Sequence, residues 1–178
     1  AARDEHGPHL FAVERDDPTL SDDFLRLLGY YVAEGCSTHF NGYPAIEWSL
    51  GDHETALADE ISDLAERCIG KRPSRTHDAR KHGLYLVVYS AELCRMMEEH
   101  GGKYAHGKRF SKAVMDLPPH RQKLATDAYY RGDGSTAREG RLTRVRALTV
   151  SRTLAFQIQE LLARRGIFVY LNVRKASD

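Results

Sequence analysis

Residues 27–35 read LLGYYVAEG, and residues 126–134 read TDAYYRGDG. Both stretches contain two adjacent tyrosines and end in an acidic residue followed by glycine. The two acids, Glu34 and Asp133, lie 99 residues apart in the chain. In the first stretch the apolar residues cover more than one face of a helix, which is typical of a helix buried on most sides. The two stretches therefore predict related helices that each end at a carboxylate.

The sequence that follows each stretch keeps nearly the same spacing. The expected N-caps of the next helices, Asp52 and Ser151, are again 99 residues apart. The glycines at which those helices should end, Gly70 and Gly166, are 96 residues apart. Spacing that is preserved over three landmarks is typical of an internal duplication, so we predict two repeats in one chain.

The first repeat is predicted over residues 21–102. Asn41-Gly42 between two extended stretches favours a β-hairpin. Apolar residues at helical spacing after Asp52 favour an amphipathic helix. The predicted order is helix, strand, strand, helix, strand, strand, helix, at residues 24–35, 37–40, 45–50, 52–70, 71–81, 84–89 and 90–102.

The remaining sequence is predicted to hold the second repeat and two connecting segments. In the second repeat a strand is expected at residues 167–173. With an offset of 96, Asp178 corresponds to His82, so counterparts of residues 83–100 are lacking. We therefore expect an incomplete second repeat and a longer parent chain. The linker, the connector and the second repeat are expected at residues 1–20, 103–117 and 118–178.

The composition is typical of a folded globular protein. Of 178 residues, 42% are hydrophobic and 29% are charged, and the formal net charge is +1, which argues against intrinsic disorder. No apolar run approaches the roughly 18 residues of a membrane span, and no basic-then-apolar leader is seen. Cys36, Cys68 and Cys94 are far apart and lack CxxC spacing, which favours reduced thiols over a disulfide framework or a zinc site. We therefore expect an intracellular protein without membrane contact.

We expect the two related helices to pack against each other about a pseudo-two-fold axis. Small residues, Gly29 and its counterpart Ala128, would allow close approach of the two backbones, and the tyrosines would be buried there. Glu34 and Asp133 would then emerge side by side. Two neighbouring carboxylates repel and need a cation, and their hard oxygen atoms suit Mg²⁺, with Mn²⁺ as an alternative. Paired acids around such a cation are suited to phosphodiester hydrolysis. The expected interface residues are Gly29, Ala128, Tyr30 and Tyr129.

With these motifs the chain resembles the LAGLIDADG (DOD-type) homing endonucleases that carry two repeats in one chain. The resemblance covers residues 21–178. It implies an α+β fold of two pseudo-symmetric αββαββα repeats, the second incomplete, packed through their motif helices. It also implies that the antiparallel sheet of each repeat lies in the DNA major groove. The acids that end the motifs, Glu34 and Asp133, are implied to bind the metal and to act in catalysis.

A basic segment before the second motif strengthens the resemblance to members found inside inteins. Residues 107–110 read GKRF, and Lys108 lies 25 residues before Asp133. The resemblance implies that Lys108 is catalytic and reaches the site, where it would polarise the attacking water or stabilise the phosphorane charge. Ser111 stands where the intein pattern has proline, which leaves Lys103 and Lys112 as alternatives.

Two local clusters of basic residues are candidates for phosphate contacts in a chain that is otherwise near neutral. Arg144 and Arg146 would share one face of a strand because side chains alternate, and arginine on such a strand can read guanine. Weaker candidates for base contacts are His39, Asn41, Glu47 and Ser49. The two clusters consist of Lys71, Arg72, Arg75, Arg80 and Lys81, and of Arg138, Arg141, Arg144, Arg146 and Arg152.

The sequence thus favours a site-specific double-strand DNA endonuclease, the endonuclease portion of an intein. It would act on duplex DNA as a monomer with internal pseudo-symmetry. One alternative is a non-cleaving DNA-binding regulator or an RNA maturase, which would keep the fold and the basic clusters but has no need for both acids. A small metal-dependent enzyme unrelated to nucleic acid would leave the arginines unexplained.

Overall fold

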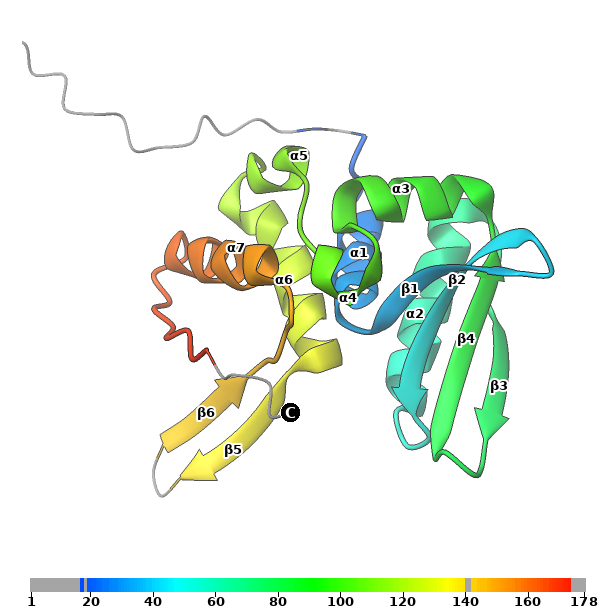
Figure 1. Cartoon of the computed structure of the whole chain (residues 1–178). Coiled ribbons are helices and arrows are strands. Elements are labelled where there is room, and N and C mark those ends of the chain that lie inside the picture. Colours follow the sequence, from blue (N-terminus) through cyan, green and yellow to red (C-terminus); the bar gives the residue numbers. More distant parts are fainter. Residues whose placement is uncertain (1–16, 18, 140–141, 174–178) are drawn as a thin grey trace, which may run out of the picture.

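The computed structural model describes residues 17, 19–139 and 142–173. Helix α1 (Asp22–Glu34) begins after Ser21, whose hydroxyl oxygen accepts a hydrogen bond from the Phe24 amide at 3.1 Å. Asp22 and Asp23 lie in its first turn, where the helix dipole favours negative charge. The helix leads directly into the first strand (Figure 1).

A four-stranded antiparallel sheet follows α1. Strands β1 (Gly35–Phe40) and β2 (Tyr43–Gly51) are joined by Asn41-Gly42, whose φ angles of 51° and 82° are those of a tight hairpin turn. Strands β3 (Ser74–Asp78) and β4 (Gly83–Tyr89) complete the sheet in the order β1-β2-β4-β3. The strands therefore match the two predicted pairs.

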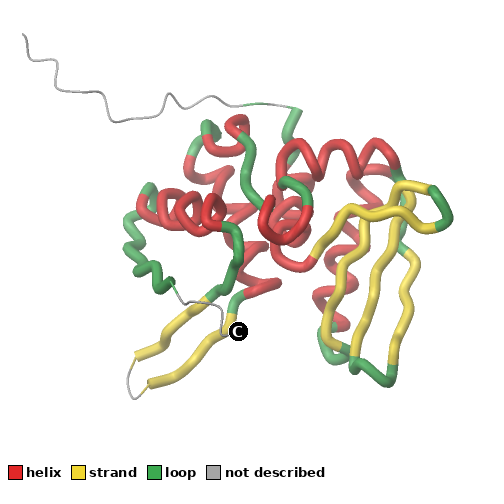
Figure 2. Tube along the Cα trace, viewed as in Figure 1, coloured by secondary structure: helices red, strands yellow, loops and turns green. Residues whose placement is uncertain are grey.

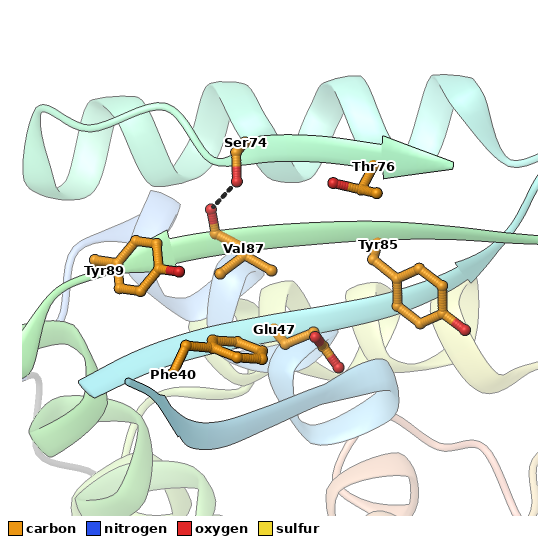
Figure 3. Close-up of a pocket in the computed structure, with 7 residues that line it drawn as sticks. All are labelled: Phe40, Glu47, Ser74, Thr76, Tyr85, Val87 and Tyr89. Carbon is orange, nitrogen blue, oxygen red and sulfur yellow. Dashed lines mark hydrogen bonds between the residues drawn. The ribbon is translucent and has the colours of Figure 1, made fainter. Parts of the chain in front are cut away.

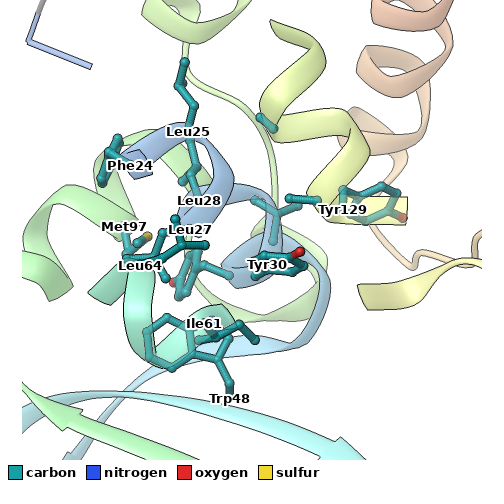
Figure 4. Packing of buried hydrophobic residues seen from close by; sticks show 14 of the residues in the cluster. Phe24, Leu25, Leu27, Leu28, Tyr30, Trp48, Ile61, Leu64, Met97 and Tyr129 are labelled. Atoms are coloured by element: carbon teal, nitrogen blue, oxygen red, sulfur yellow. The ribbon is translucent and has the colours of Figure 1, made fainter. Parts of the chain in front are cut away.

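Three helices cover one face of this sheet. They are α1, α2 (Thr55–Ile69) and α3 (Ala91–Gly101), and no described helix covers the other face, which we call the open face (Figure 2). Alternation along the strands sends one set of side chains towards the helices. In this set Ile46, Trp48 and Leu86 are fully buried. Figure 4 shows Trp48 and Ile61 beneath the leucines of α1.

The second half repeats the beginning of this arrangement. Helix α6 leads directly into a hairpin, and a further helix follows. Two short helices lie in the connector. The elements are α4 (Tyr104–Gly107), α5 (Lys112–Met115), α6 (Pro119–Asp133), β5 (Ser135–Glu139), β6 (Leu142–Arg146) and α7 (Arg152–Ala163).

The fold class is as predicted. The chain is α+β, with a complete αββαββα first repeat and an αββα second repeat in the part that the structure describes. Helices α1 and α6 pack against each other between the two sets of strands (Figure 1). The structure describes no helix that is long and apolar enough to cross a membrane.

The expected N-cap of the second helix is wrong. Helix α2 has Glu54 at its N-cap, and Asp52 instead accepts a hydrogen bond from His82 at 3.2 Å. The equivalent cap of α7 is Ser151, whose hydroxyl accepts from the Leu154 amide at 3.2 Å. The structural spacing of the caps is therefore 97 residues, between the 99 of the motif acids and the 96 of the glycines.

The strand predicted at residues 167–173 is also wrong, because this segment has no strand conformation. In the first repeat the corresponding strand, β3, lies at the sheet edge and pairs with β4. With the offset of 96, a counterpart of β4 would fall at residues 179–185, outside the 178-residue sequence. Among the described residues no strand pairs with this segment, and a strand needs such a neighbour to satisfy its backbone hydrogen bonds.

Candidate active site

The site is built on the contact between α1 and α6. A Cβ atom at Gly29 would overlap the Ala125 carbonyl oxygen and lie 2.7 Å from the Ala128 Cβ. One helical turn further along, at the equivalent positions 33 and 132, a Cβ at Gly132 would lie 2.8 Å from the Ala33 Cβ. Each helix thus contributes a glycine that faces an alanine of the other. These small residues let the backbones approach closely, as the pseudo-two-fold arrangement requires.

The motif tyrosines fill the space around this contact. Tyr30 and Tyr129 are 1% and 2% exposed. The Tyr30 hydroxyl donates to Glu60 on α2 at 2.9 Å, and Arg131 forms an ion pair with the same carboxylate at 2.6 Å. The Tyr129 hydroxyl donates to Asp133 at 3.2 Å. Tyr129 therefore belongs both to the interface and to the polar site at the helix ends.

Each motif acid is followed by glycine because the chain leaves the helix sharply. A Cβ at Gly35 would lie 2.7 Å from the Tyr31 Cα. A Cβ at Gly134 would overlap the carbonyl oxygen of Tyr130, the residue that corresponds to Tyr31. The φ angles of the two glycines are ordinary, −93° and −80°, so space and not conformation demands glycine. The turn sets each acid at the junction of a helix and a strand.

Glu34 and Asp133 converge at this junction. Burial, the charge of Asp133 and the charge of Glu54 raise the pKa of Glu34 to about 7. Burial also raises the pKa of Asp133, against hydrogen bonds from the Tyr129 hydroxyl and the Leu148 backbone that lower it. Both acids lie at helix C-termini, where the helix dipole disfavours negative charge. The ionised carboxylates of Glu34 and Asp133 therefore repel each other, and a bound cation would reduce this repulsion.

The donor set fits a hard divalent cation that keeps most of its water. Mg²⁺ is commonly held by one or two carboxylates together with waters and substrate phosphate oxygens. No group of three or more His, Cys, Asp or Glu side chains in the described residues is arranged to hold a metal ion. The carboxylates of Glu34 and Asp133 therefore suit an open divalent-cation site and not a closed structural one.

Lys108 lies beneath the C-terminal end of α1 and is 7% exposed. Its ammonium donates to the carbonyl oxygens of Tyr31 at 2.7 Å and Gly35 at 2.8 Å, and it lies 3.3 Å from the centre of the Tyr31 ring. Burial lowers the pKa of Lys108 to about 7. The structure thus brings Lys108 to the first motif, but both hydrogen bonds go to the backbone and not to Glu34 or Asp133.

The alternative lysines are engaged elsewhere. Lys103 forms an ion pair with Glu98 at 2.8 Å, and Lys112 forms one with Asp116 at 2.7 Å. Of the three lysines considered from the sequence, Lys108 is therefore the one in contact with a motif helix.

In the structure, the residues of the first basic cluster lie in two different environments. Arg75 forms an ion pair with Asp59 of α2 at 2.7 Å. Arg72 pairs at 2.7 and 2.8 Å with two further acids of the same helix. Both arginines are thus held on the helix side of the sheet. Lys71 donates to the Tyr89 carbonyl at 3.2 Å, and Arg80 and Lys81 are exposed in the turn between β3 and β4.

The second basic cluster lies mainly on the β5–β6 hairpin. Arg144 and Arg146 are exposed and alternate along β6 onto one face, opposite Ala137 and Ser135 of β5. Arg138 is exposed on β5. Arg152 begins α7, with its guanidinium over the Phe156 ring at 5.6 Å. Arg141 lies outside the described residues.

The weaker candidates for base contacts also lie on different sides of the first sheet. Glu47 and Ser49 alternate onto the open face of β2, and Asn41 is exposed in the hairpin turn. His39 alternates with Phe40, which lines that open face, so His39 projects to the other side. Two of the four candidates therefore lie on the face that the helices leave uncovered.

Glu54, which acts on Glu34 through its charge, was not found from the sequence. Tyr129 was expected only as an interface residue, and its hydroxyl also donates a hydrogen bond to Asp133. The 97-residue spacing between Glu54 and Ser151 would have indicated Glu54 as a cap, but the aspartate two positions earlier is the better capping residue by type.

Comparisons with known proteins agree with this architecture. The model of the LAGLIDADG-like domain family matches residues 21–101 and 127–178. A crystal structure of I-DmoI in complex with DNA and Mn covers 88% of this chain and 85% of its own, with 13% identity and a TM-score of 0.65. A complex of I-DmoI with DNA and Ca has a TM-score of 0.62 at 14% identity, over 84% of this chain and 74% of that one. These structures share the fold.

Relatives among well-described proteins are much longer. An iron-sulfur cluster assembly SufBD family protein of Mycobacterium tuberculosis is 29% identical over 153 residues, which are 86% of this chain and 18% of that protein. A DNA polymerase of Thermococcus litoralis is 31% identical over 153 residues, which are 83% of this chain and 8% of that protein. The chain thus spans less than a fifth of either relative. With the family model matching both repeats, the chain belongs to the LAGLIDADG-like domain family.

Proposed function

We propose that the chain is a site-specific DNA endonuclease that binds one duplex site as a monomer and cuts both strands. The observation that carries the proposal is the convergence of Glu34 and Asp133 at the ends of two packed helices. Two half-buried acids beside phosphate would only weaken a pure binding protein, because like charges repel. The fold shared with I-DmoI, whose structures contain DNA, supports duplex DNA as the partner.

Glu34 and Asp133 would hold the divalent cation, Mg²⁺ with Mn²⁺ as an alternative. When bound, the cation supplies Lewis-acid chemistry that polarises the phosphodiester and neutralises charge on the leaving oxygen. The Tyr129 hydroxyl would orient the Asp133 carboxylate through its hydrogen bond of 3.2 Å. The repulsion between the two acids in the metal-free site would favour binding of a cation, because the cation neutralises their charge.

Lys108 would act through the placement of Glu34. Its ammonium fixes the carbonyls of Tyr31 and Gly35, on either side of Glu34 in the chain. We therefore propose a positioning role for Lys108 in place of direct contact with water or phosphate. A positioning lysine should affect the rate through geometry, so arginine, which reaches the same carbonyls with a different shape, should not replace it fully.

The DNA would lie across the open face of the first sheet and the β5–β6 hairpin. Residues 21–102 and 118–178 would form the two DNA-binding repeats, with residues 103–117 as the connector and residues 1–20 as a linker. Contacts to phosphates and base edges would come from basic residues near β3, in the β3–β4 turn, on the β5–β6 hairpin and at the start of α7. They are Lys71, Arg80, Lys81, Arg138, Arg144, Arg146 and Arg152. Arg141, outside the described residues, is also proposed to contact DNA.

We also propose that the chain is the endonuclease portion of an intein. The related segments occur within a SufBD family protein and within DNA polymerases, which are proteins of different kinds. In each case the similarity covers less than a fifth of the longer protein. The same segment inside unrelated proteins supports a mobile insertion over a domain that those proteins need for their own activity.

The test is cleavage of a library of duplexes with randomised sequence, incubated with the chain and Mg²⁺, followed by sequencing of the cut ends. We expect specific double-strand cuts by the wild type and none by Asp133→Asn. Asp63→Asn, which alters an exposed acid of α2, is the matched control and should cut normally. Cutting that persists in Asp133→Asn contradicts the catalytic assignment. Specific binding without any cutting by the wild type would favour a DNA-binding regulator.

A further inference from the structure

The open face of the first sheet carries a shallow groove over its two central strands (Figure 3). Glu47 lies in the middle of β2, directly opposite Val87 of β4. The side chains around it are hydroxyl-bearing or apolar. They include Ser74, Thr76, Tyr85, Val87 and Tyr89.

Glu47 is the charged residue of this groove, since the other described residues that line it are neutral. The nearby arginines do not compensate it, because Arg72 and Arg75 pair with acids of α2 on the helix side. The middle of a face that is proposed to meet DNA thus presents a carboxylate. That charge opposes binding to any phosphate and is favourable only beside a hydrogen-bond donor.

The second repeat carries the opposite charge at the equivalent position. In the first hairpin Glu47 pairs across the strands with Cys36, and in the second Arg146 pairs with Ser135. Both members of the second pair are 99 residues after those of the first, the same offset as the motif acids. Arg146 therefore occupies the place of Glu47 under the pseudo-two-fold.

Glu47 can only accept hydrogen bonds from a base edge when ionised, whereas Arg146 can only donate them. In the major groove a carboxylate accepts from the cytosine N4 amino group, whereas a guanidinium donates to guanine O6 and N7. A carboxylate that faces the oxygen of guanine or thymine meets a like partial charge, and this repulsion rejects the wrong base. At two symmetry-related positions, the protein therefore offers an acceptor in the first repeat and a donor in the second.

We propose that Glu47 and Arg146 together set the orientation in which this pseudo-symmetric protein binds its target, Glu47 selecting cytosine and Arg146 selecting guanine at symmetry-related positions. The inference rests on the proposed DNA binding and deepens it. A molecule with two similar halves can approach a duplex in two directions that differ by half a turn. Only an asymmetric pair of contacts distinguishes these directions, and the pair with reversed charge does so most strongly.

The test selects randomised duplexes that bind the full chain and compares the sequences enriched by the wild type and by variants. The wild type should enrich cytosine at one position and guanine at its symmetry-related position. Glu47→Gln should lose the cytosine preference by about tenfold, because an amide can also bind adenine. The double variant Glu47→Arg with Arg146→Glu should exchange the two preferences. Glu92→Gln, on α3, is the control and should change nothing.

The outcomes separate the inference from the proposed function. Enrichment by the wild type that is unchanged in Glu47→Gln and in the exchanged double variant overturns the role of these residues and leaves DNA binding intact. If the wild type enriches no sequence at all, site-specific binding is wrong and this inference falls with it. Thermal melting of each variant checks that lost selection does not come from unfolding.

Discussion

Gly29 packs so closely against Ala125 that a Cβ atom at position 29 would overlap the Ala125 carbonyl oxygen. Helix α6 is therefore held against α1 backbone to backbone at this point. Both helices end at the site, so their separation also sets the separation of the two carboxylates. The small residues of the motif thus determine the geometry of the acids that end it.

Gly29→Ala should destabilise the fold and disturb the site. The added methyl group meets backbone atoms, which cannot move aside as a side chain can, so we expect a loss of about 2 kcal/mol in the free energy of unfolding. Urea denaturation measures it. Gly107→Ala is the matched control, because a Cβ there has no atom within 4 Å. Equal stability of the two variants would contradict the close packing of α1 and α6.

Glu34→Gln should stabilise the metal-free protein at alkaline pH only. The pKa of Glu34 is raised to about 7 in the folded chain, above its value in the unfolded chain, so its ionisation opposes folding increasingly as the pH rises between these two values. We expect the variant to be more stable by about 2 kcal/mol at pH 8, after allowance for partial solvent exposure, and unchanged at pH 4.

Thermal or urea unfolding in the presence of a chelator measures this difference. Added Mg²⁺ should then stabilise the wild type at pH 8 and have little effect on Glu34→Gln, because one carboxylate is lost. A wild type whose stability is the same at pH 5 and pH 8 would argue against repulsion at the helix ends.

Lys108→Met should weaken the junction between α1 and β1. The substitution removes two hydrogen bonds to the carbonyls of Tyr31 and Gly35 and leaves these buried acceptors without partners, which we expect to cost about 3 kcal/mol. Lys112→Met removes an exposed lysine of the same connector and should cost less than about 1 kcal/mol. Similar losses in both variants, measured by denaturation, would show that Lys108 does not anchor the motif.

Arg144→Ala and Arg75→Ala should differ in their effect on DNA binding. Arg144 is exposed on β6, so we expect its removal to lower the slope of log affinity against log salt by about 1. Arg75 is paired with Asp59 of α2 at 2.7 Å, and its removal should leave the slope unchanged. Titrations of duplex DNA at several salt concentrations provide the measurement. An equal change of slope would place both arginines at the phosphate backbone.

The elements that the sequence predicts well are those whose signals are local. The Asn41-Gly42 turn, the apolar pattern of α1 and the glycines after Glu34 and Asp133 each act within a few residues. The segment at 167–173 has the composition of a strand, yet it forms none, because a strand depends on a neighbour distant in sequence. The N-cap of α2 was misplaced by two residues for a related reason, since Asp52 is held by His82 across the sheet end.

The sequence by itself determined that the chain has two repeats, which helices end in acids, and that these helices would pack through small residues. Periodicity and spacing carry this information because they follow from the geometry of the backbone. Only the tertiary structure decided which charged groups face which partners. Arg72 and Arg75 form ion pairs with acids of α2, and Lys108 binds carbonyl groups at the end of α1. Glu47 lines the groove on the open face, and Arg146, at the equivalent position of the second hairpin, carries the opposite charge. The direction and pairing of a charged side chain depend on residues that folding brings near, and a linear pattern does not record them.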